Sequence, residues 1–195
     1  MSDWRNRSFK LSKLNMIKDG FWWGKTITWL NFEARASLQE KLKTLNWYRI
    51  ENNHAVYFQN KKVAEIYQKH DLYKNLLEPN WINYKTLISK KLLPDNAIYV
   101  IVKNTMYIIE IKYQEVAGSV DEKLQTCDFK KKQYERLLRP LKLIVEYCYV
   151  LRWEWFWKPE YKDVLNYIQA VWCKYFFDEL PLDYLWLPIP NDDKK

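Results

Sequence analysis

The clearest pattern of apolar and polar positions lies between residues 94 and 139. Side chains two apart share one face of a strand, and the run 106–113 is apolar on both faces except for Glu110 and Lys112. A preceding apolar run, 97–102, and a polar turn predict that the two runs pair as a β-hairpin. Charge at the end of such a buried strand is costly unless it is paired or binds an ion.

The position of the turn sets which residues meet across the hairpin. If the turn centres on Asn104, Lys112 lies opposite Asn96, and Asp95 is one residue from Lys112 across the ladder. We therefore expect one end of the hairpin to collect Asp95, Glu110 and Lys112.

A long helix is predicted after the hairpin. Ser119 and Glu122 form a capping box, in which the hydroxyl and the carboxylate satisfy the first free amides of the helix. Apolar residues then recur on one face as far as Leu138, and Pro140 ends the helix. The apolar run 141–151 follows as a strand, expected to be central and parallel to one hairpin strand after this crossover.

The remaining segments add helices and short strands. Helical spacing is found at 31–45 (capped by Asn31), 63–77 and 161–171, strand-like runs at 47–50 and 55–59, and a terminal extension at 175–195. This order predicts an α/β fold with a mixed central β-sheet flanked by helices.

Composition narrows the class of protein. A chain of 195 residues suits a single domain, 1–195, and residues 1–25 look like a basic arm. The net charge of +8 favours a polyanionic partner, although basic surfaces also occur in proteins that bind no nucleic acid. No apolar leader or membrane-length run is found, so we expect a cytoplasmic protein. Three scattered cysteines and two histidines do not assemble a zinc pattern.

Two carboxylates and a lysine at one hairpin end suit a magnesium site. Mg²⁺ takes few protein ligands, prefers oxygen and keeps several waters. A lysine beside it can orient or deprotonate a water, or balance a developing phosphate charge. The alternative is a charged hairpin end that only forms a salt bridge.

Pro94-Asp95 followed by Glu110-x-Lys112 resembles the signature of the PD-(D/E)XK nuclease superfamily. The continuation KYQEVAGSVDEKLQTCDFKKKQYERLL is similar to a branch of type II restriction endonucleases and phage nucleases, where a Gly-Ser turn leads into a Lys-rich helix beside the site. The resemblance implies a restriction-endonuclease-like core with residues 94–151 as its catalytic part.

The resemblance also implies roles for particular residues. Asp95, Glu110 and the carbonyl of Ile111 would hold Mg²⁺, and Lys112 would orient the attacking water. The run ending in Glu33 is similar to one whose glutamate comes near the metal in those nucleases, although the dipole of a helix also favours an acid there.

Polar residues after the hairpin are candidates for DNA contacts beside the site. They are Gln114, Ser119, Lys123, Gln125, Lys130 and Lys131. Lysines in such a row can bind phosphates, which position a protein without reading sequence. A row of charges on a helix is also what a solvated face looks like.

The implied function is a magnesium-dependent type II restriction endonuclease that cuts double-stranded DNA at a specific sequence. Its implied partners are a second copy of the chain, matching a palindromic target, and a cognate DNA methyltransferase acting on the same site. The alternatives are a structure-directed repair or recombination nuclease, a non-catalytic nucleic-acid-binding protein on the same fold, and an interaction protein with an ion-paired hairpin end.

The chain has unusually few glycines, three, and unusually many tryptophans, eleven. Several tryptophans stand where a turn or a close approach is expected, and in the resembling nucleases their counterparts would read as glycine. These positions are Trp22, Trp23, Trp29, Trp81 and Trp186. One hypothesis is a genome that uses the UGA codon for glycine. The other is an authentic aromatic-rich sequence.

Overall fold

The computed structural model describes residues 29–31, 37–112 and 120–190. All but residue 190 belong to one compact unit, Thr28–Ile189. The predicted basic arm, Glu33, Gln114 and Ser119 lie outside the described residues. None of the described helices is long and apolar enough to cross a membrane.

A mixed sheet of seven strands forms the centre of this unit. Its strands are β2 (Tyr48–Glu51), β3 (Ala55–Phe58), β4 (Lys61–Tyr67), β5 (Asn96–Val100), β6 (Thr105–Lys112), β7 (Ile144–Leu151) and β8 (Lys174–Phe177), adjacent in that order. Strands β6, β7 and β8 are parallel, and the other neighbours are antiparallel. The α/β fold with a mixed central sheet is thus confirmed, as is the parallel strand after the helical crossover.

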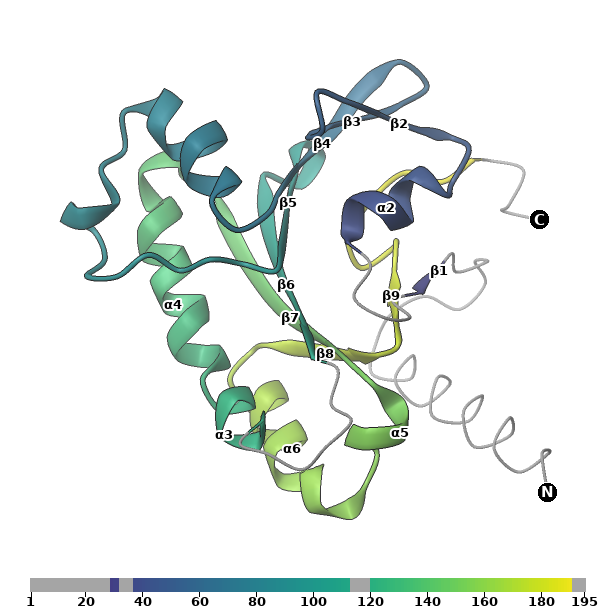
Figure 1. The fold of residues 1–195 in the computed structure, drawn as a ribbon, viewed down its shortest axis with the longest axis vertical. Helices are drawn as coiled ribbons and strands as arrows, with labels where there is room; N and C mark the ends of the chain where they lie inside the picture. The colour runs from purple at the N-terminus through teal and green to yellow at the C-terminus, as the bar shows by residue number, and fades with distance from the viewer. Residues whose placement is uncertain (1–28, 32–36, 113–119, 191–195) are drawn as a thin grey trace. The chain divides into compact units, whose positions relative to one another are not determined.

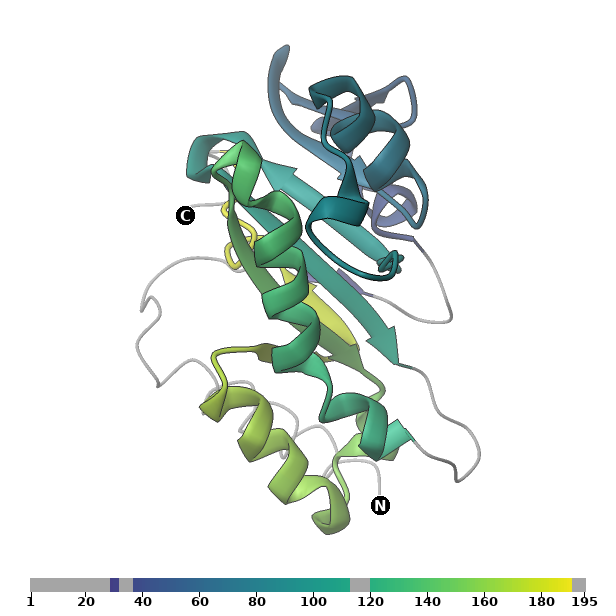
Figure 2. The same ribbon diagram turned by 90° about the vertical axis from the view of Figure 1, so that its left-hand side faces the viewer.

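Helices cover both faces of the sheet (Figures 1 and 2). The described α-helices are α2 (Leu38–Lys43), α3 (Val120–Leu124), α4 (Cys127–Leu138), α5 (Trp153–Phe156) and α6 (Lys162–Ala170). A π-helix, η1 (Leu72–Leu77), and the three-residue 3₁₀ turns η2 (Glu78–Asn80), η3 (Tyr84–Thr86), η4 (Ile101–Lys103), η5 (Arg139–Leu141) and η6 (Pro159–Tyr161) complete the helical structure of the described residues. One face packs against α4, α6 and η1, and we call it the α4 face. The other, the α2 face, packs against α2 and a ribbon of β1 (Trp29–Asn31) and β9 (Glu179–Pro181).

Strand β6 supplies both apolar cores. Met106 and Ile108 point into the cluster of the α4 face, whereas Tyr107 and Ile109 point into that of the α2 face. This is the alternation expected of a strand with period two. A parallel strand between covering helices is buried on both sides, so its sequence is apolar almost throughout.

The register of the β5–β6 hairpin differs from the expectation. Asn96 pairs with Ile109 rather than with Lys112. The loop contains a helical turn, Ile101–Lys103, followed by Asn104 in the left-handed conformation at φ 50°. Asparagine tolerates this conformation better than most residues, so the turn is centred before Asn104 and the pairing shifts.

The helix predicted at 63–77 is wrong, since most of its first half belongs to strand β4. That strand pairs with β3 on one side and β5 on the other, and it buries Ala64 and Ile66. Its apolar residues Val63, Ile66 and Tyr67 are spaced three and four apart, which is also the spacing of a helix, so the pattern did not distinguish the two. Helical structure begins only at Leu72, and His70 before it is exposed.

Two other helix boundaries also differ. Helix α2 begins after Ser37, not after Asn31, which instead ends strand β1. Ser37 and Glu40 form a reciprocal capping box, with each backbone amide donating to the other side chain. The helix predicted after residue 119 is divided into α3 and α4, and the predicted terminal extension provides β9 and most of β8.

Candidate active site

Asp95, Glu110 and Lys112 meet at one end of the β5–β6 hairpin. Lys112 Nζ lies 2.8 Å from Glu110 Oε2 and 3.5 Å from Asp95 Oδ2. The Ile111 N–H donates to Asp95 Oδ2 at 3.2 Å, which holds the aspartate against the neighbouring strand. The shifted register places the position of Asp95 across from Glu110. One ammonium group therefore binds two carboxylates from adjacent strand ends.

Glu110 is the most buried charged residue of this site, with a side chain 7% exposed. Its Oε2 atom accepts a second hydrogen bond from Lys130 Nζ at 3.2 Å. Lys130 comes from helix α4, so the two cations around Glu110 belong to different elements. A carboxylate this far from water needs such partners, because an unpaired buried charge is strongly destabilising.

The sequence made Lys130 a candidate for a DNA contact and did not predict its pairing with Glu110. A signal was present in the helical spacing. Lys130 lies three residues after Cys127 and four before Tyr134, and both of these are buried on the face of α4 that packs on the sheet. A lysine on that stripe is directed toward the sheet, where a carboxylate is its natural partner.

The protonation of Lys112 results from two opposing effects. Burial disfavours the charged ammonium and lowers its pKa, but the attraction of Glu110 and Asp95 outweighs burial. The pKa of Lys112 is therefore raised above its ordinary value of 10.5. At neutral pH Lys112 is a cation that donates hydrogen bonds to both carboxylates.

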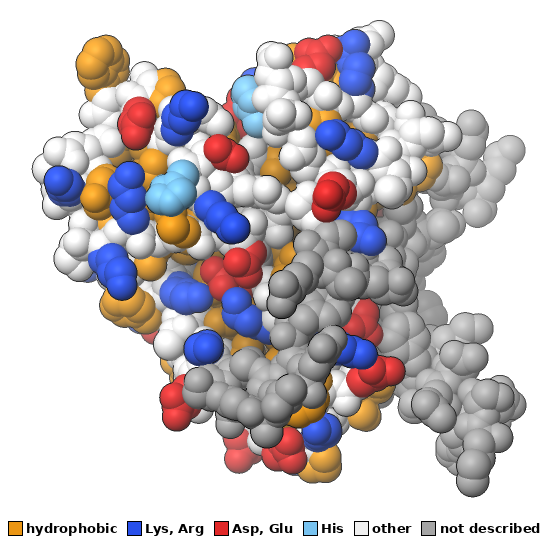
Figure 3. Space-filling view, viewed as in Figure 1, with side chains coloured by type: hydrophobic (Ala, Val, Ile, Leu, Met, Phe, Trp, Pro, Cys, Tyr) orange, Lys and Arg blue, Asp and Glu red, His pale blue; other side chains and the backbone are white. Residues whose placement is uncertain are grey.

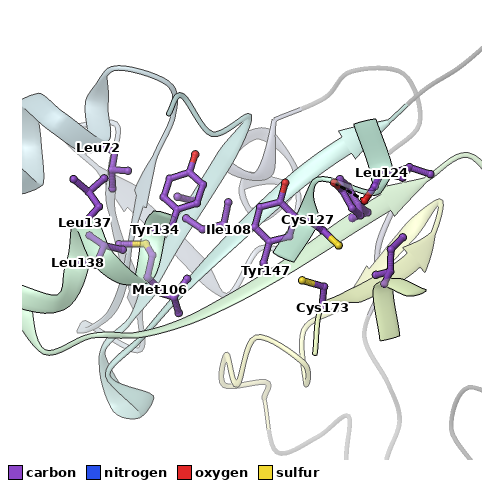
Figure 4. Close-up of a cluster of buried hydrophobic side chains, with 14 of the residues drawn as sticks. Leu72, Met106, Ile108, Leu124, Cys127, Tyr134, Leu137, Leu138, Tyr147 and Cys173 are labelled. Carbon is purple, nitrogen blue, oxygen red and sulfur yellow. Dashed lines mark hydrogen bonds between the residues drawn. The ribbon is translucent and has the colours of Figure 1, made fainter. Parts of the chain in front are cut away.

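Two tyrosines lie between α4 and the sheet beneath this site. Tyr134 comes from α4 and Tyr147 from β7, and their hydroxyl groups point to the same side (Figure 4). Burial, followed by the negative charge of Glu110, raises the pKa of both hydroxyls far above the usual range. Both tyrosines therefore stay neutral, and they add no negative charge to the site.

Asn96 anchors the strand end next to Asp95. Its side chain is buried, and Oδ1 accepts hydrogen bonds from the Leu38 N–H at 3.0 Å and from Gln68 Nε2 at 2.9 Å. These bonds connect β5 to the start of α2 and to the segment after β4. Asn96 and Gln68 were not among the predicted site residues, because their partners lie far away in the sequence.

The other described candidates for DNA contacts, Lys131, Lys123 and Gln125, do not contact the three charged residues of the site. Lys131 Nζ binds the Trp172 carbonyl at 2.9 Å and lies 3.9 Å from Glu146, so it joins α4 to the segments after α6 and on β7. Lys123 and Gln125 are exposed around the junction of α3 and α4. Figure 3 shows acidic and basic side chains together near the middle of the face in view.

The oxygen donors of the site fit a hard divalent cation. Asp95 Oδ1 and Glu110 Oε1 accept no hydrogen bond from the described residues, and both carboxylates already converge on one positive charge. Among the described residues, no group of three or more His, Cys, Asp or Glu side chains is placed so that it could hold a metal ion. Two carboxylates with waters and a backbone carbonyl suit Mg²⁺, and they do not suit a structural zinc.

No protein-family model, curated protein or solved structure matches this chain. The resemblance to the PD-(D/E)XK nucleases therefore rests on the sequence motif alone.

Proposed function

We propose that the protein is a magnesium-dependent endonuclease of the type II restriction kind, built on a restriction-endonuclease-like core and specific for a short sequence in double-stranded DNA. The observation that carries the proposal is the Lys112 ammonium group between the carboxylates of Asp95 and Glu110. The Pro94-Asp95 and Glu110-x-Lys112 signature supplies the reaction class. A mixed sheet with helices on both faces is compatible with it.

Each residue has a role in this reaction. Asp95, Glu110 and the carbonyl of Ile111 would hold Mg²⁺, which when bound supplies a Lewis acid for the phosphate and a water of lowered pKa. Lys112 orients the attacking water and donates hydrogen bonds to negative charge developing on the phosphate. Lys130 holds the Glu110 carboxylate in position. The water attacks phosphorus in line, and the bond from phosphorus to the 3′ oxygen breaks. Solvent takes the proton lost by the water and protonates the departing oxygen, so the products carry a 5′-phosphate and a 3′-hydroxyl.

The partners follow from this function. Double-stranded DNA is the substrate, and the net charge of +8 favours its binding. A homodimer would match a palindromic target, and a cognate methyltransferase would protect the same sequence in the cytoplasm of the host. Glu33, Gln114 and Ser119 remain proposed contributors from outside the described residues, together with Lys123 and Gln125 on the exposed surface.

Digestion of plasmid and genomic DNA with Mg²⁺ tests the proposal. The wild-type chain is compared with Lys112→Ala and with Lys162→Ala, which removes an exposed lysine from α6. We expect discrete fragments that are lost with EDTA, at least a hundredfold slower cleavage for Lys112→Ala, and full activity for Lys162→Ala. A circular dichroism spectrum confirms that each variant is folded.

Other outcomes identify the alternative functions. Cleavage only at branched or damaged substrates would favour a repair or recombination nuclease. Salt-sensitive DNA binding that is indifferent to Mg²⁺ and to Lys112→Ala would favour a non-catalytic binding protein. Folded protein without DNA affinity at moderate salt would leave the hairpin end as an ion pair in an interaction protein.

A further inference from the structure

Three tryptophans have the backbone conformation that glycine adopts most easily. The φ angles of Trp81, Trp172 and Trp186 are 55°, 59° and 53°. In this left-handed region the Cβ atom of an L-residue crowds the following carbonyl oxygen, and only glycine avoids the cost. Asparagine and aspartate tolerate the region, and they fill several of the other left-handed positions. Tryptophan has no such local compensation.

The same hydrogen-bond motif surrounds all three. In each, the tryptophan amide donates to the carbonyl three residues earlier, and the next amide donates to the carbonyl five residues before it. The bonds are Trp81 to Glu78 (3.0 Å) with Ile82 to Leu77 (3.0 Å), Trp172 to Gln169 (3.1 Å) with Cys173 to Ile168 (3.0 Å), and Trp186 to Asp183 (3.0 Å) with Leu187 to Leu182 (3.2 Å). This is the Schellman motif, whose left-handed C′ position is usually glycine.

The apolar residues of the motif are also in place. A Schellman motif favours an apolar contact between C″, the residue after the left-handed position, and C3, four residues before the left-handed position. In each of the three motifs these two residues belong to the same apolar cluster. The pairs are Ile82 with Leu77, Cys173 with Ile168, and Leu187 with Leu182. The motif is therefore complete three times, apart from the tryptophan at its C′ position.

The indole rings of Trp81 and Trp172 contribute little packing. Trp81 is 95% exposed and Trp172 is 79% exposed, and neither ring contacts another ring or a cation among the described residues. Trp186 is 41% exposed and lies 3.4 Å under Lys103 Nζ. By contrast, Trp153 stacks on Trp157 at 4.1 Å in a right-handed helical segment.

The distribution of glycine in the chain agrees with this difference. All three glycines, at positions 20, 24 and 118, lie outside the described residues. The described residues therefore contain no glycine, although they form three Schellman motifs, and each motif has a tryptophan at its C′ position.

We propose that glycine occupies positions 81, 172 and 186 in the protein as its natural host makes it, because the host reads UGA codons there as glycine. Position 172 was not among the five suspected from sequence. Trp29 lies in strand β1, whose backbone does not require glycine, and Trp22 and Trp23 lie outside the described residues. The exposed indoles at 81, 172 and 186 are then not a surface for stacking bases or docking a partner.

Reading the codons and the peptide masses of protein isolated from the host tests the proposal directly. UGA codons with glycine masses at the three positions are expected. UGG codons, or tryptophan masses, would overturn it.

A stability measurement tests its physical basis. For the recombinant chain, Trp→Gly and Trp→Ala are compared at each position by urea denaturation. Both remove the indole, but only glycine relieves the left-handed conformation, so each glycine variant should have a folded-to-unfolded ratio about five- to thirtyfold above its alanine partner. Trp157→Gly, in the stacked pair, should lower that ratio. Equal glycine and alanine variants at all three positions would overturn the proposal.

Discussion

The two faces of the central sheet are both buried, yet they differ where strand β6 ends. On the α2 face, Tyr107 and Ile109 continue an apolar cluster. On the α4 face, Ile108 is followed by Glu110, which pairs with Lys112 and Lys130. One strand supplies both faces, so burial by itself does not decide polarity. Charge persists on the face where a helix brings a second cation to the carboxylate.

The largest expected effect follows from removing that carboxylate. Glu110→Ala leaves Lys112 and Lys130 close together with little solvent around them, and we expect a loss of about 3–5 kcal/mol in the free energy of unfolding. Urea denaturation measures it.

The triple variant Glu110→Leu, Lys112→Met, Lys130→Met makes the α4 face resemble the α2 face. It should be as stable as wild type or about 1–4 kcal/mol more stable, without cleaving DNA. A Glu110→Ala cost no greater than that of Lys162→Ala would contradict this account.

The next largest loss of stability is expected on the α2 face. Ile109 is fully buried, so Ile109→Ala should cost about 2–5 kcal/mol through lost burial and the cavity that remains. The same denaturation experiment applies. The folded fraction should retain the proposed Mg²⁺-dependent cleavage, which distinguishes this loss from that of Glu110→Ala. Abolished cleavage in folded protein would show that the two faces are not separable.

The smallest effect is expected at Asp178, which lies at the same end of the parallel strands as the candidate site. Asp178 follows β8 and accepts a hydrogen bond from the Trp153 N–H at 3.0 Å. Burial, then the charges of Glu154 and Glu179, raises its pKa above 3.8, against the opposing effects of that amide and of Arg152. The Asp178 carboxyl thus binds its proton more tightly in the folded state than in the unfolded chain. This proton binding stabilises the fold fully below pH 3.8, and the stabilisation is lost as pH rises through the folded-state pKa.

Asp178→Asn should therefore raise stability modestly at neutral pH, and the gain should vanish below pH 3.8. Asparagine keeps the acceptor for the Trp153 amide and tolerates the left-handed backbone at this position, where φ is 54°. Denaturation curves of both proteins across acidic and neutral pH measure the difference. A gain that does not depend on pH would assign the effect to something other than the charge.

Sequence alone predicted much of the region around the candidate site. The alternation in β6 and the turn before it predicted a hairpin, and the position of Asp95 and Glu110-x-Lys112 predicted that three charges meet at its end. Such predictions succeed because strand periodicity and hairpin pairing depend on residues close in sequence. The parallel β7 followed for another reason, because a strand that returns to the same sheet through a covering helix runs in the same direction as the strand it left.

Tertiary structure decided the rest. The four-residue loop set the β5–β6 register, and the pairing of β4 on both sides overrode its helix-like spacing. Lys130 reached Glu110 only because α4 packs on that face, and Asn96 met Leu38 only because α2 packs on the other. Contacts between distant segments depend on how whole elements pack, which local patterns of apolar and polar residues do not encode.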